Sequence, residues 1–129
     1  MSDDKKRILL VEDETDLRDL YRDILQEEGF IVEEAKDGHE ALAKMKKGGY
    51  DLVLLDILLP NGLDGLDVLK KLQQEPPEKP NGPVLILSNL DKESVIAEGV
   101  TLGIRGYLLK SDLDPGQIVK EVKNVLASP

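Results

Sequence analysis

The sequence predicts an α/β domain in which five parallel strands form an open, doubly wound sheet with helices on both faces. Three observations favour this fold. Short apolar runs recur five times, segments with helical periodicity separate them, and the central runs contain no polar interruption. Uninterrupted apolar runs are typical of strands buried on both faces, and strands that alternate with helices are typical of parallel crossover connections.

The expected strands follow the apolar runs in chain order. They cover residues 8–11, 30–32, 52–55, 84–87 and 107–109. The second run turns polar at Glu33 and Glu34. A strand that is not apolar throughout is expected at an edge of the sheet, so we predict an edge position for it.

Each expected helix shows apolar residues at spacings of three and four. The first helix carries Tyr21 on its apolar stripe and ends near Gly29, and the second ends before Gly48 and Gly49. The third, fourth and fifth helices have an acidic residue at their start, which predicts N-caps. These residues are Asp64, Asp91 and Asp114, the last followed by Pro115.

Composition narrows the class of protein. The 129 residues carry 17 basic and 26 acidic side chains, a net charge of −9, which argues against binding to nucleic-acid phosphates. The chain has no cysteine, and no apolar run approaches the roughly 20 residues that span a bilayer. We therefore expect one domain over residues 1–129, soluble and cytoplasmic, with no direct contact to nucleic acid or membrane.

Polar side chains follow four of the five expected strands. The first strand runs into Glu12 and Asp13, the third into Asp56, the fourth into Ser88 and the fifth into Lys110. In open parallel sheets, ligands bind beyond the carboxyl ends of the strands. These five side chains are therefore expected to converge on one rim of the sheet.

The chemistry of these groups indicates phosphoryl transfer. Carboxylates from Glu12, Asp13 and Asp56 repel one another unless a cation lies between them, and oxygen ligands favour Mg²⁺. A carboxylate flanked by Mg²⁺ and Lys110 is well placed to receive a phosphoryl group. Asp56 lies on the middle strand and is the expected nucleophile, and Ser88 can bond a phosphoryl oxygen.

The residues resemble the receiver domains of two-component response regulators. The likeness rests on the acidic pair after the first strand, "LLDILLP" around Asp56, Ser88, and "GYLLK" ending at Lys110, all in the family's order. It implies a flavodoxin-like sheet of order 2-1-3-4-5, resembling the chemotaxis regulators. It also implies that a histidine kinase or a histidine phosphotransfer protein phosphorylates Asp56.

The resemblance also implies a role for each site residue. Asp13, Asp56 and the backbone carbonyl of Leu58 would bind Mg²⁺, and Glu12 would act through a water molecule. Lys110 would hold the phosphoryl group.

Ser88 and Tyr107 occupy the family's switch positions. They would alter a face formed by the fourth helix, fifth strand and fifth helix, which would contact a downstream protein or an output domain. No enzyme activity is expected beyond the domain's own phosphorylation and dephosphorylation.

The sequence departs from the family's pattern at three positions. Ser111 follows Lys110 where proline is common, so we expect a trans peptide bond there. Asn89 replaces a small residue and is expected to shield the phosphoryl group from water. The loop "LPNGLDG" carries one additional residue, which we expect Asn61 and Gly62 to absorb in an exposed turn of positive φ, outside the metal site.

Two alternatives stay open. A Mg²⁺-dependent phosphatase or dehalogenase-like hydrolase also uses an aspartate nucleophile, but such enzymes usually carry a second aspartate where this chain has Leu58. A pseudo-receiver would bind partners without phosphorylation, and the complete acidic pocket argues against it. A nucleotide site is not indicated, because neither a P-loop nor a G-x-G-x-x-G motif opens the first helix.

Overall fold

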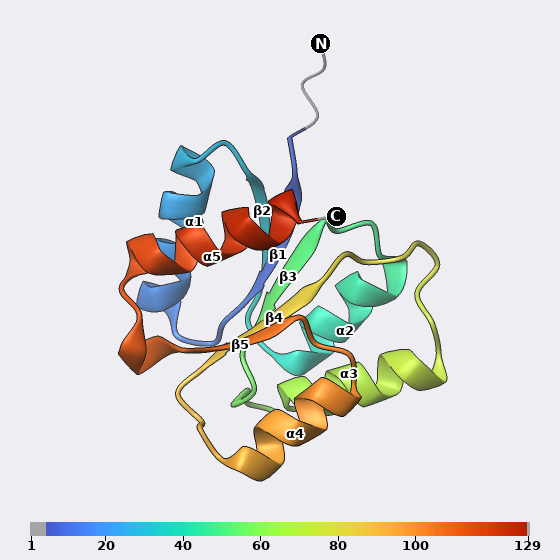
Figure 1. The fold of residues 1–129 in the computed structure, drawn as a ribbon. Coiled ribbons are helices and arrows are strands. Elements are labelled where there is room, and N and C mark those ends of the chain that lie inside the picture. Colours follow the sequence, from blue (N-terminus) through green and yellow to red (C-terminus); the bar gives the residue numbers. More distant parts are fainter. Residues whose placement is uncertain (1–4, 129) are drawn as a thin grey trace.

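The computed structural model describes residues 5–128 as a parallel β-sheet with helices on both faces (Figure 1). The strands are β1 (Arg7–Val11), β2 (Ile31–Ala35), β3 (Leu52–Leu55), β4 (Val84–Ser88) and β5 (Gly106–Leu109). The helices are α1 (Thr15–Glu27), α2 (Gly38–Lys47), α3 (Gly65–Gln74), α4 (Glu93–Thr101) and α5 (Pro115–Ala127). One turn of 3₁₀-helix, η1 (Lys110–Asp112), follows β5.

The sheet has the order β2-β1-β3-β4-β5, and all four strand pairs are parallel. The chain first adds β2 on one side of β1 and then adds β3, β4 and β5 on the other. Strand order therefore reverses beside β1 and β3, where open α/β sheets form their ligand sites. The predicted flavodoxin-like, doubly wound fold is confirmed.

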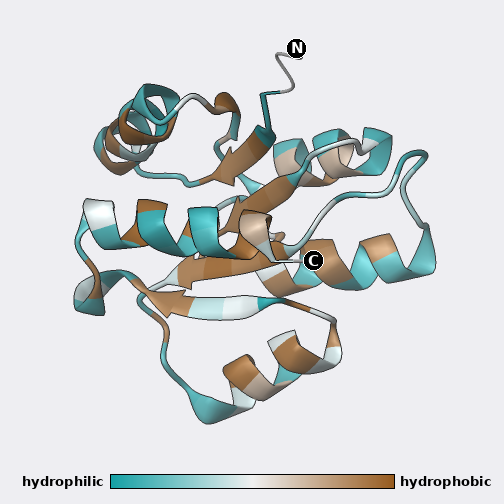
Figure 2. Ribbon diagram, turned by 45° about the horizontal axis from the view of Figure 1, so that its top comes forward, coloured by the Kyte–Doolittle hydropathy of each residue, from teal (hydrophilic) through white to brown (hydrophobic). Residues whose placement is uncertain are grey.

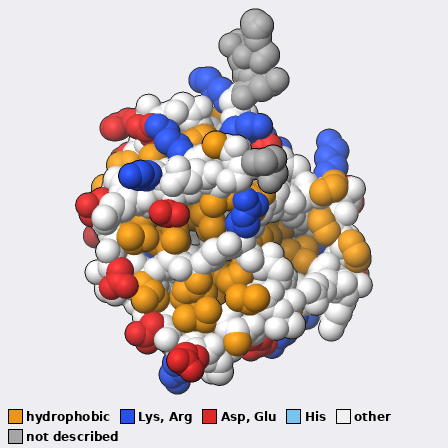
Figure 3. Space-filling model, in the orientation of Figure 1, with side chains coloured by type: hydrophobic (Ala, Val, Ile, Leu, Met, Phe, Trp, Pro, Cys, Tyr) orange, Lys and Arg blue, Asp and Glu red, His pale blue; other side chains and the backbone are white. Residues whose placement is uncertain are grey.

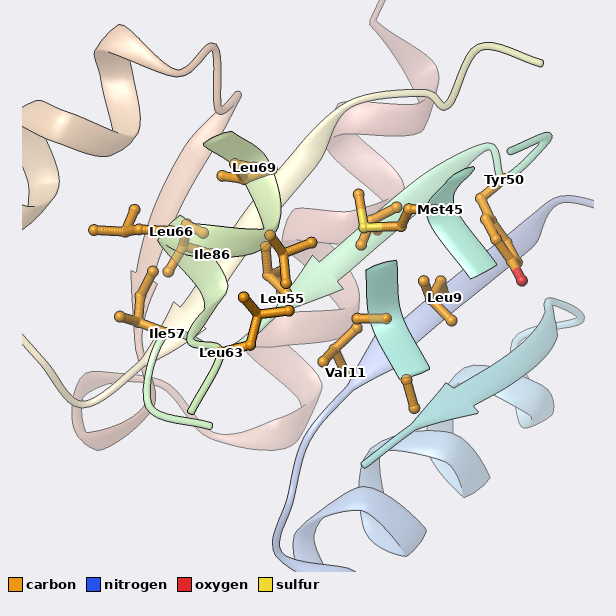
Figure 4. Packing of buried hydrophobic residues seen from close by; sticks show 14 residues of the cluster. Leu9, Val11, Met45, Tyr50, Leu55, Ile57, Leu63, Leu66, Leu69 and Ile86 are labelled. Carbon is orange, nitrogen blue, oxygen red and sulfur yellow. The ribbon is translucent and has the colours of Figure 1, made fainter. Parts of the chain in front are cut away.

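Two layers of apolar side chains hold the helices on the sheet. On one face, α2, α3 and α4 pack on side chains that include Leu9, Val11, Leu55 and Ile86 (Figure 4). On the other face, α1 and α5 pack on a second cluster that contains Ile8 and Leu10. The central strands are accordingly apolar, while the helices alternate between apolar and polar bands (Figure 2). Tyr21 lies in the second cluster and is 4% exposed, as its place on the helical stripe predicted.

Strand β2 lies at the edge of the sheet, as predicted, but it extends further than the apolar run. Glu33 and Glu34 pair with Leu9 and Leu10 of β1, and their carboxylates have basic partners. Glu33 accepts a hydrogen bond from Arg7 at 2.5 Å, and Glu34 accepts one from Arg18 at 3.1 Å. Ion pairing thus lets charged residues continue a half-buried edge strand.

Two of the three predicted N-caps are present. Asp64 and Asp114 each accept a hydrogen bond from the backbone three residues later and complete a capping box. The prediction for Asp91 is wrong, because α4 begins after Lys92 and no side chain caps it. The longest helices have 13 residues. Within residues 5–128, no helix is both long and apolar enough to cross a membrane.

Two local predictions about the backbone are also confirmed. Asn61 has φ 71° and Gly62 has φ 84°, and both residues are exposed, so the additional loop residue forms a turn of positive φ. Two successive positive φ values are typical of a type I′ turn. The Lys110–Ser111 bond is trans, since no cis peptide bond occurs in the described part of the chain.

Candidate functional site

The strand order brings the predicted side chains to one rim of the sheet. Glu12 follows β1, Asp56 follows β3, Ser88 ends β4 and Lys110 opens η1 after β5. They surround a cavity of about 220 Å³. Its lining residues are Glu12, Asp13, Glu14, Asp56, Leu58, Ser88, Asn89 and Lys110.

Lys110 joins the two buried carboxylates of the site. Its Nζ lies 2.6 Å from Glu12 Oε1 and 2.7 Å from Asp56 Oδ2. Glu12 is 1% exposed and Asp56 4%, so these charges are shielded from water and depend on one another. Burial raises the pKa of Glu12 despite the neighbouring ammonium group. Burial lowers the pKa of Lys110, but its bonds to Asp56 and Glu12 outweigh burial, and the net shift is upward.

The backbone around Asp56 orients its carboxylate. Leu58 N donates to Asp56 Oδ1 at 3.2 Å, which leaves Oδ2 for Lys110. Helix α3 approaches closely through Gly65, whose N donates to Ile57 O at 2.9 Å. A Cβ at Gly65 would lie 2.3 Å from the carbonyl oxygen of Asp56, so only glycine permits this approach.

Three carboxylates form a candidate metal centre. One oxygen from each of Glu12, Asp13 and Asp56 lies within 4.8 Å of the other two. Asp13 is exposed, whereas the other two are buried. Because all three donors are hard oxygens beside a cavity with room for water, the residues present fit Mg²⁺.

Arg18 supports the loop between β1 and α1, a role that the sequence did not reveal. Its Nη1 donates to the carbonyl of Glu12 at 2.8 Å, while its Nε donates to Glu34 at 3.1 Å. Glu14 N also donates to Glu12 Oε2 at 3.0 Å. The acidic pair is therefore held by backbone and side-chain contacts. The only signal in the sequence was a basic residue one turn into an otherwise acidic helix start.

Ser88 and Tyr107 both contact Leu90, in the segment after β4. Ser88 is fully buried, and its Oγ accepts a hydrogen bond from Leu90 N at 3.3 Å. The hydroxyl of half-buried Tyr107 donates to the carbonyl of Leu90. Both side chains thus contact one residue, which connects the rim of the cavity to β5.

A larger concavity of about 410 Å³ lies away from this rim, among α2, α3 and the loop before β4. It is lined by residues that include Met45, Leu69, Leu72 and Pro76, and none of its lining residues is charged. It therefore lacks the acids, bases and nucleophiles that the smaller cavity brings together.

Comparison with known proteins identifies the family. The family model described as "Response regulator receiver domain" matches residues 8–123. The transcriptional regulatory protein ResD of Bacillus subtilis is 35% identical over 120 residues, which cover 93% of this chain and 48% of ResD. The alkaline phosphatase synthesis transcriptional regulatory protein PhoP of the same organism is 37% identical over 121 residues, 94% of this chain and 48% of PhoP. The chain thus spans about half the length of these relatives.

A solved structure agrees with these matches. The CheY-like response regulator receiver domain protein from Methanospirillum hungatei superposes with a TM-score of 0.83 at 28% identity, covering 95% of this chain and 94% of that one. The fold, the strand-end residues and the family match are therefore consistent with one another. The chain belongs to the response regulator receiver domain family.

Proposed function

We propose that this receiver domain accepts a phosphoryl group on Asp56 in a Mg²⁺-dependent reaction with a phosphohistidine donor. The observation that carries the proposal is the pairing of buried Asp56 with Lys110 at 2.7 Å, beside two further carboxylates. Membership of the receiver family supports the same chemistry. The donor is a histidine kinase or a histidine phosphotransfer protein.

Asp13, Asp56 and the carbonyl of Leu58 hold the metal in this proposal, and Glu12 contacts it through water. Bound Mg²⁺ supplies positive charge that stabilises the oxygens of the transferring group. Lys110, the first residue of η1 after β5, supplies further positive charge. Before phosphorylation, that ammonium group forms an ion pair with each of Glu12 and Asp56.

In the transfer step, a carboxylate oxygen of Asp56 attacks the phosphorus of the phosphohistidine. The new P–O bond forms as the P–N bond breaks, and the departing imidazole takes its proton from solvent. Lys110 exchanges the carboxylate oxygen for a phosphoryl oxygen. Ser88 Oγ, which accepts from Leu90 N, donates its own proton to another phosphoryl oxygen.

The proposed switch starts at Ser88. Movement of its hydroxyl toward the phosphoryl group displaces Leu90, and the Tyr107 hydroxyl that donates to the Leu90 carbonyl moves with it. The added charge of about −2 provides the driving force. Amide chemical shifts of residues 91–103 and of Tyr107 should change on phosphorylation, and changes confined to the rim would contradict this switch.

The proposed output face consists of α4, β5 and α5. Figure 3 shows apolar side chains gathered between these elements, with acidic side chains along the margin. A groove of about 310 Å³ on this face is lined by Tyr107, Leu108 and Leu113, among others. Val100 on α4 is 64% exposed. We propose that a downstream protein or an output domain binds here.

Phosphorylation can be tested with a small phosphodonor and Mg²⁺, followed by mapping of the acid-labile phosphate. Asp56→Asn preserves the shape of the side chain but removes the nucleophile, so labelling should disappear. The matched control is Asp112→Asn, which changes an exposed aspartate near the same rim and should label normally. Phosphate that persists on the Asp56→Asn variant contradicts the assignment. An unlabelled parent that still binds its target supports the pseudo-receiver alternative instead.

A further inference from the structure

The chain contains two Asn-Gly pairs, Asn61–Gly62 and Asn81–Gly82. Asparagine before glycine is prone to deamidation, because glycine has no side chain to hinder its own backbone nitrogen. That nitrogen attacks the asparagine Cγ, a C–N bond forms, and the side-chain amide leaves as ammonia with the displaced proton. Water then opens the resulting succinimide to aspartate or isoaspartate. The two pairs are identical in sequence, so any difference between them comes from the fold.

The first pair is open to this reaction. Asn61 and Gly62 are exposed, and no atom lies within 4 Å of the position that a Cβ on Gly62 would occupy. Within residues 5–128, the Gly62 N–H has no hydrogen-bond acceptor that meets ordinary distance and angle limits. The attacking nitrogen is therefore free, and Gly62 has space to rearrange, while the Asn61 side chain is held by one hydrogen bond, from its Nδ2 to Asp37.

In the second pair, hydrogen bonds and close contacts oppose this reaction. Gly82 N donates to Tyr50 O at 2.7 Å, which occupies the nitrogen that would attack. The Asn81 side chain donates to Met45 O at 3.0 Å and accepts from Tyr50 N at 3.4 Å. A Cβ on Gly82 would lie 1.9 Å from Asp51 O, so the backbone has no room to turn. Asn81–Gly82 is a matched internal control for Asn61–Gly62.

Asn61 also fastens the loop after β3 to the start of α2. Its Nδ2 donates to Asp37 Oδ2 at 3.0 Å, and its carbonyl lies 2.9 Å from His39 Nε2. Asp37 is 8% exposed and caps α2. The hydrogen bond from Glu40 N–H, and to a smaller extent the one from Asn61, lowers the pKa of the Asp37 carboxyl group. Gly38 lies so close to the loop that a Cβ there would be 2.1 Å from Leu63 O.

We propose that Asn61 is a deamidation site whose modification releases this loop from α2. The reaction replaces the Nδ2 donor with a carboxylate that faces Asp37, so a hydrogen bond becomes a repulsion between like charges. The loop from Leu58 to Leu63 then loses its side-chain hydrogen bond to Asp37, while the contact between the Asn61 carbonyl and His39 remains. Because the proposed function assigns the Leu58 carbonyl to Mg²⁺, deamidation also lowers Mg²⁺ affinity.

Ageing the folded protein at mildly alkaline pH tests the reaction itself. Peptide mass mapping should find conversion at Asn61 and an intact amide at Asn81. The same protein aged in denaturant should convert at both positions, because the contacts that protect Asn81 are absent. An intact Asn61, or equal conversion of both pairs in the folded protein, would overturn the proposal.

Asn61→Asp reproduces the main consequence without ageing. In the absence of metal, its amides in residues 58–64 should exchange hydrogen faster than those of the parent, while α1 and α5 keep their protection. Mg²⁺ affinity should also fall, because the loop that carries the Leu58 carbonyl loses a contact with the start of α2. Adding Asp37→Asn restores a donor opposite the new carboxylate, and asparagine is also a good N-cap, so the double variant should recover both properties.

These measurements separate the proposal from the proposed function. If the parent binds no Mg²⁺, the metal assignment is wrong, whereas mass mapping and metal-free exchange still decide whether Asn61 deamidates and whether it anchors the loop. Unchanged exchange in the Asn61→Asp variant would overturn the anchoring role. If exchange accelerates but Mg²⁺ affinity stays at the parent's value, the predicted coupling to the metal site is refuted.

Discussion

Replacing Lys110 with methionine removes the positive charge that Glu12 and Asp56 share while keeping most of the side chain's volume. Nζ lies within 2.7 Å of both carboxylates, and the lysine side chain is only 11% exposed. Breaking a buried pair by removal of one partner typically costs about 3–5 kcal/mol, because the remaining charge is left uncompensated. We expect Lys110→Met to lose about this amount of unfolding free energy at pH 8 without metal.

The loss of unfolding free energy in Lys110→Met should increase as the pH rises. Burial already raises the pKa of Glu12 above its ordinary 4.5, and without Lys110 the repulsion from Asp56 raises it further. A carboxyl group whose pKa is higher in the folded than in the unfolded state stabilises the folded protein fully at pH values below its unfolded-state pKa. This stabilisation is lost as the pH rises through the folded-state pKa. The difference between variant and parent should therefore be small near pH 5 and largest at pH 8.

Urea unfolding followed by far-ultraviolet circular dichroism measures this difference. Lys120→Met, which changes an exposed lysine on α5, is the control and should remain close to the parent. Saturating Mg²⁺ should stabilise Lys110→Met more than it stabilises the parent, because in the variant the cation binds beside two unpaired carboxylates. A ligand present at 100 times its Kd raises the free energy of unfolding by about 2.7 kcal/mol. A loss below about 1 kcal/mol at pH 8, or one independent of pH, would refute the reasoning.

Three further predictions concern single residues. Asp13→Ala should weaken Mg²⁺ binding strongly in calorimetric titrations while metal-free stability stays within about 0.5 kcal/mol of the parent, as for other surface substitutions; unchanged affinity would remove Asp13 from the site. Burial and the hydrogen bond to Glu33 raise the pKa of Tyr50 to about 12, so its stabilising effect is lost as pH rises from its ordinary value of 10. Between pH 9 and pH 11 the parent should therefore lose about 1.3 kcal/mol more than Tyr50→Phe in urea unfolding, and equal losses would contradict the shift. Asp64→Ala removes the N-cap of α3 and should cost about 1 kcal/mol, with a cost near zero showing that the capping box is not stabilising.

Much of the fold could be predicted because its signals are local. Apolar runs of three or four residues indicated the strands, and helical spacing indicated the faces that cover them. The site also followed from the sequence, since the carboxyl ends of parallel strands share one rim wherever each strand lies. The sequence alone was enough to predict that Asp56, Lys110 and Ser88 lie close together.

Other features depend on contacts between distant residues. Glu33 and Glu34 continue β2 by pairing with β1, and Arg7 and Arg18 reach their carboxylates from other elements. Asp91 carries the residue type of a cap, yet the register of α4 places the cap position one residue later, at Lys92. Residue type alone does not determine which partner a charged side chain finds.

The sequence by itself determined the order of the elements, the rim on which the polar groups meet and the positive φ of the Asn61–Gly62 turn, because these follow from local patterning and backbone sterics. The tertiary structure alone decided that Lys110 bonds two carboxylates and that Asn61 binds α2 while the identical pair at Asn81 is locked. These contacts join residues that are far apart in sequence. Their energies depend on burial and on distances of a few ångströms, which exist only once the sheet and helices have packed.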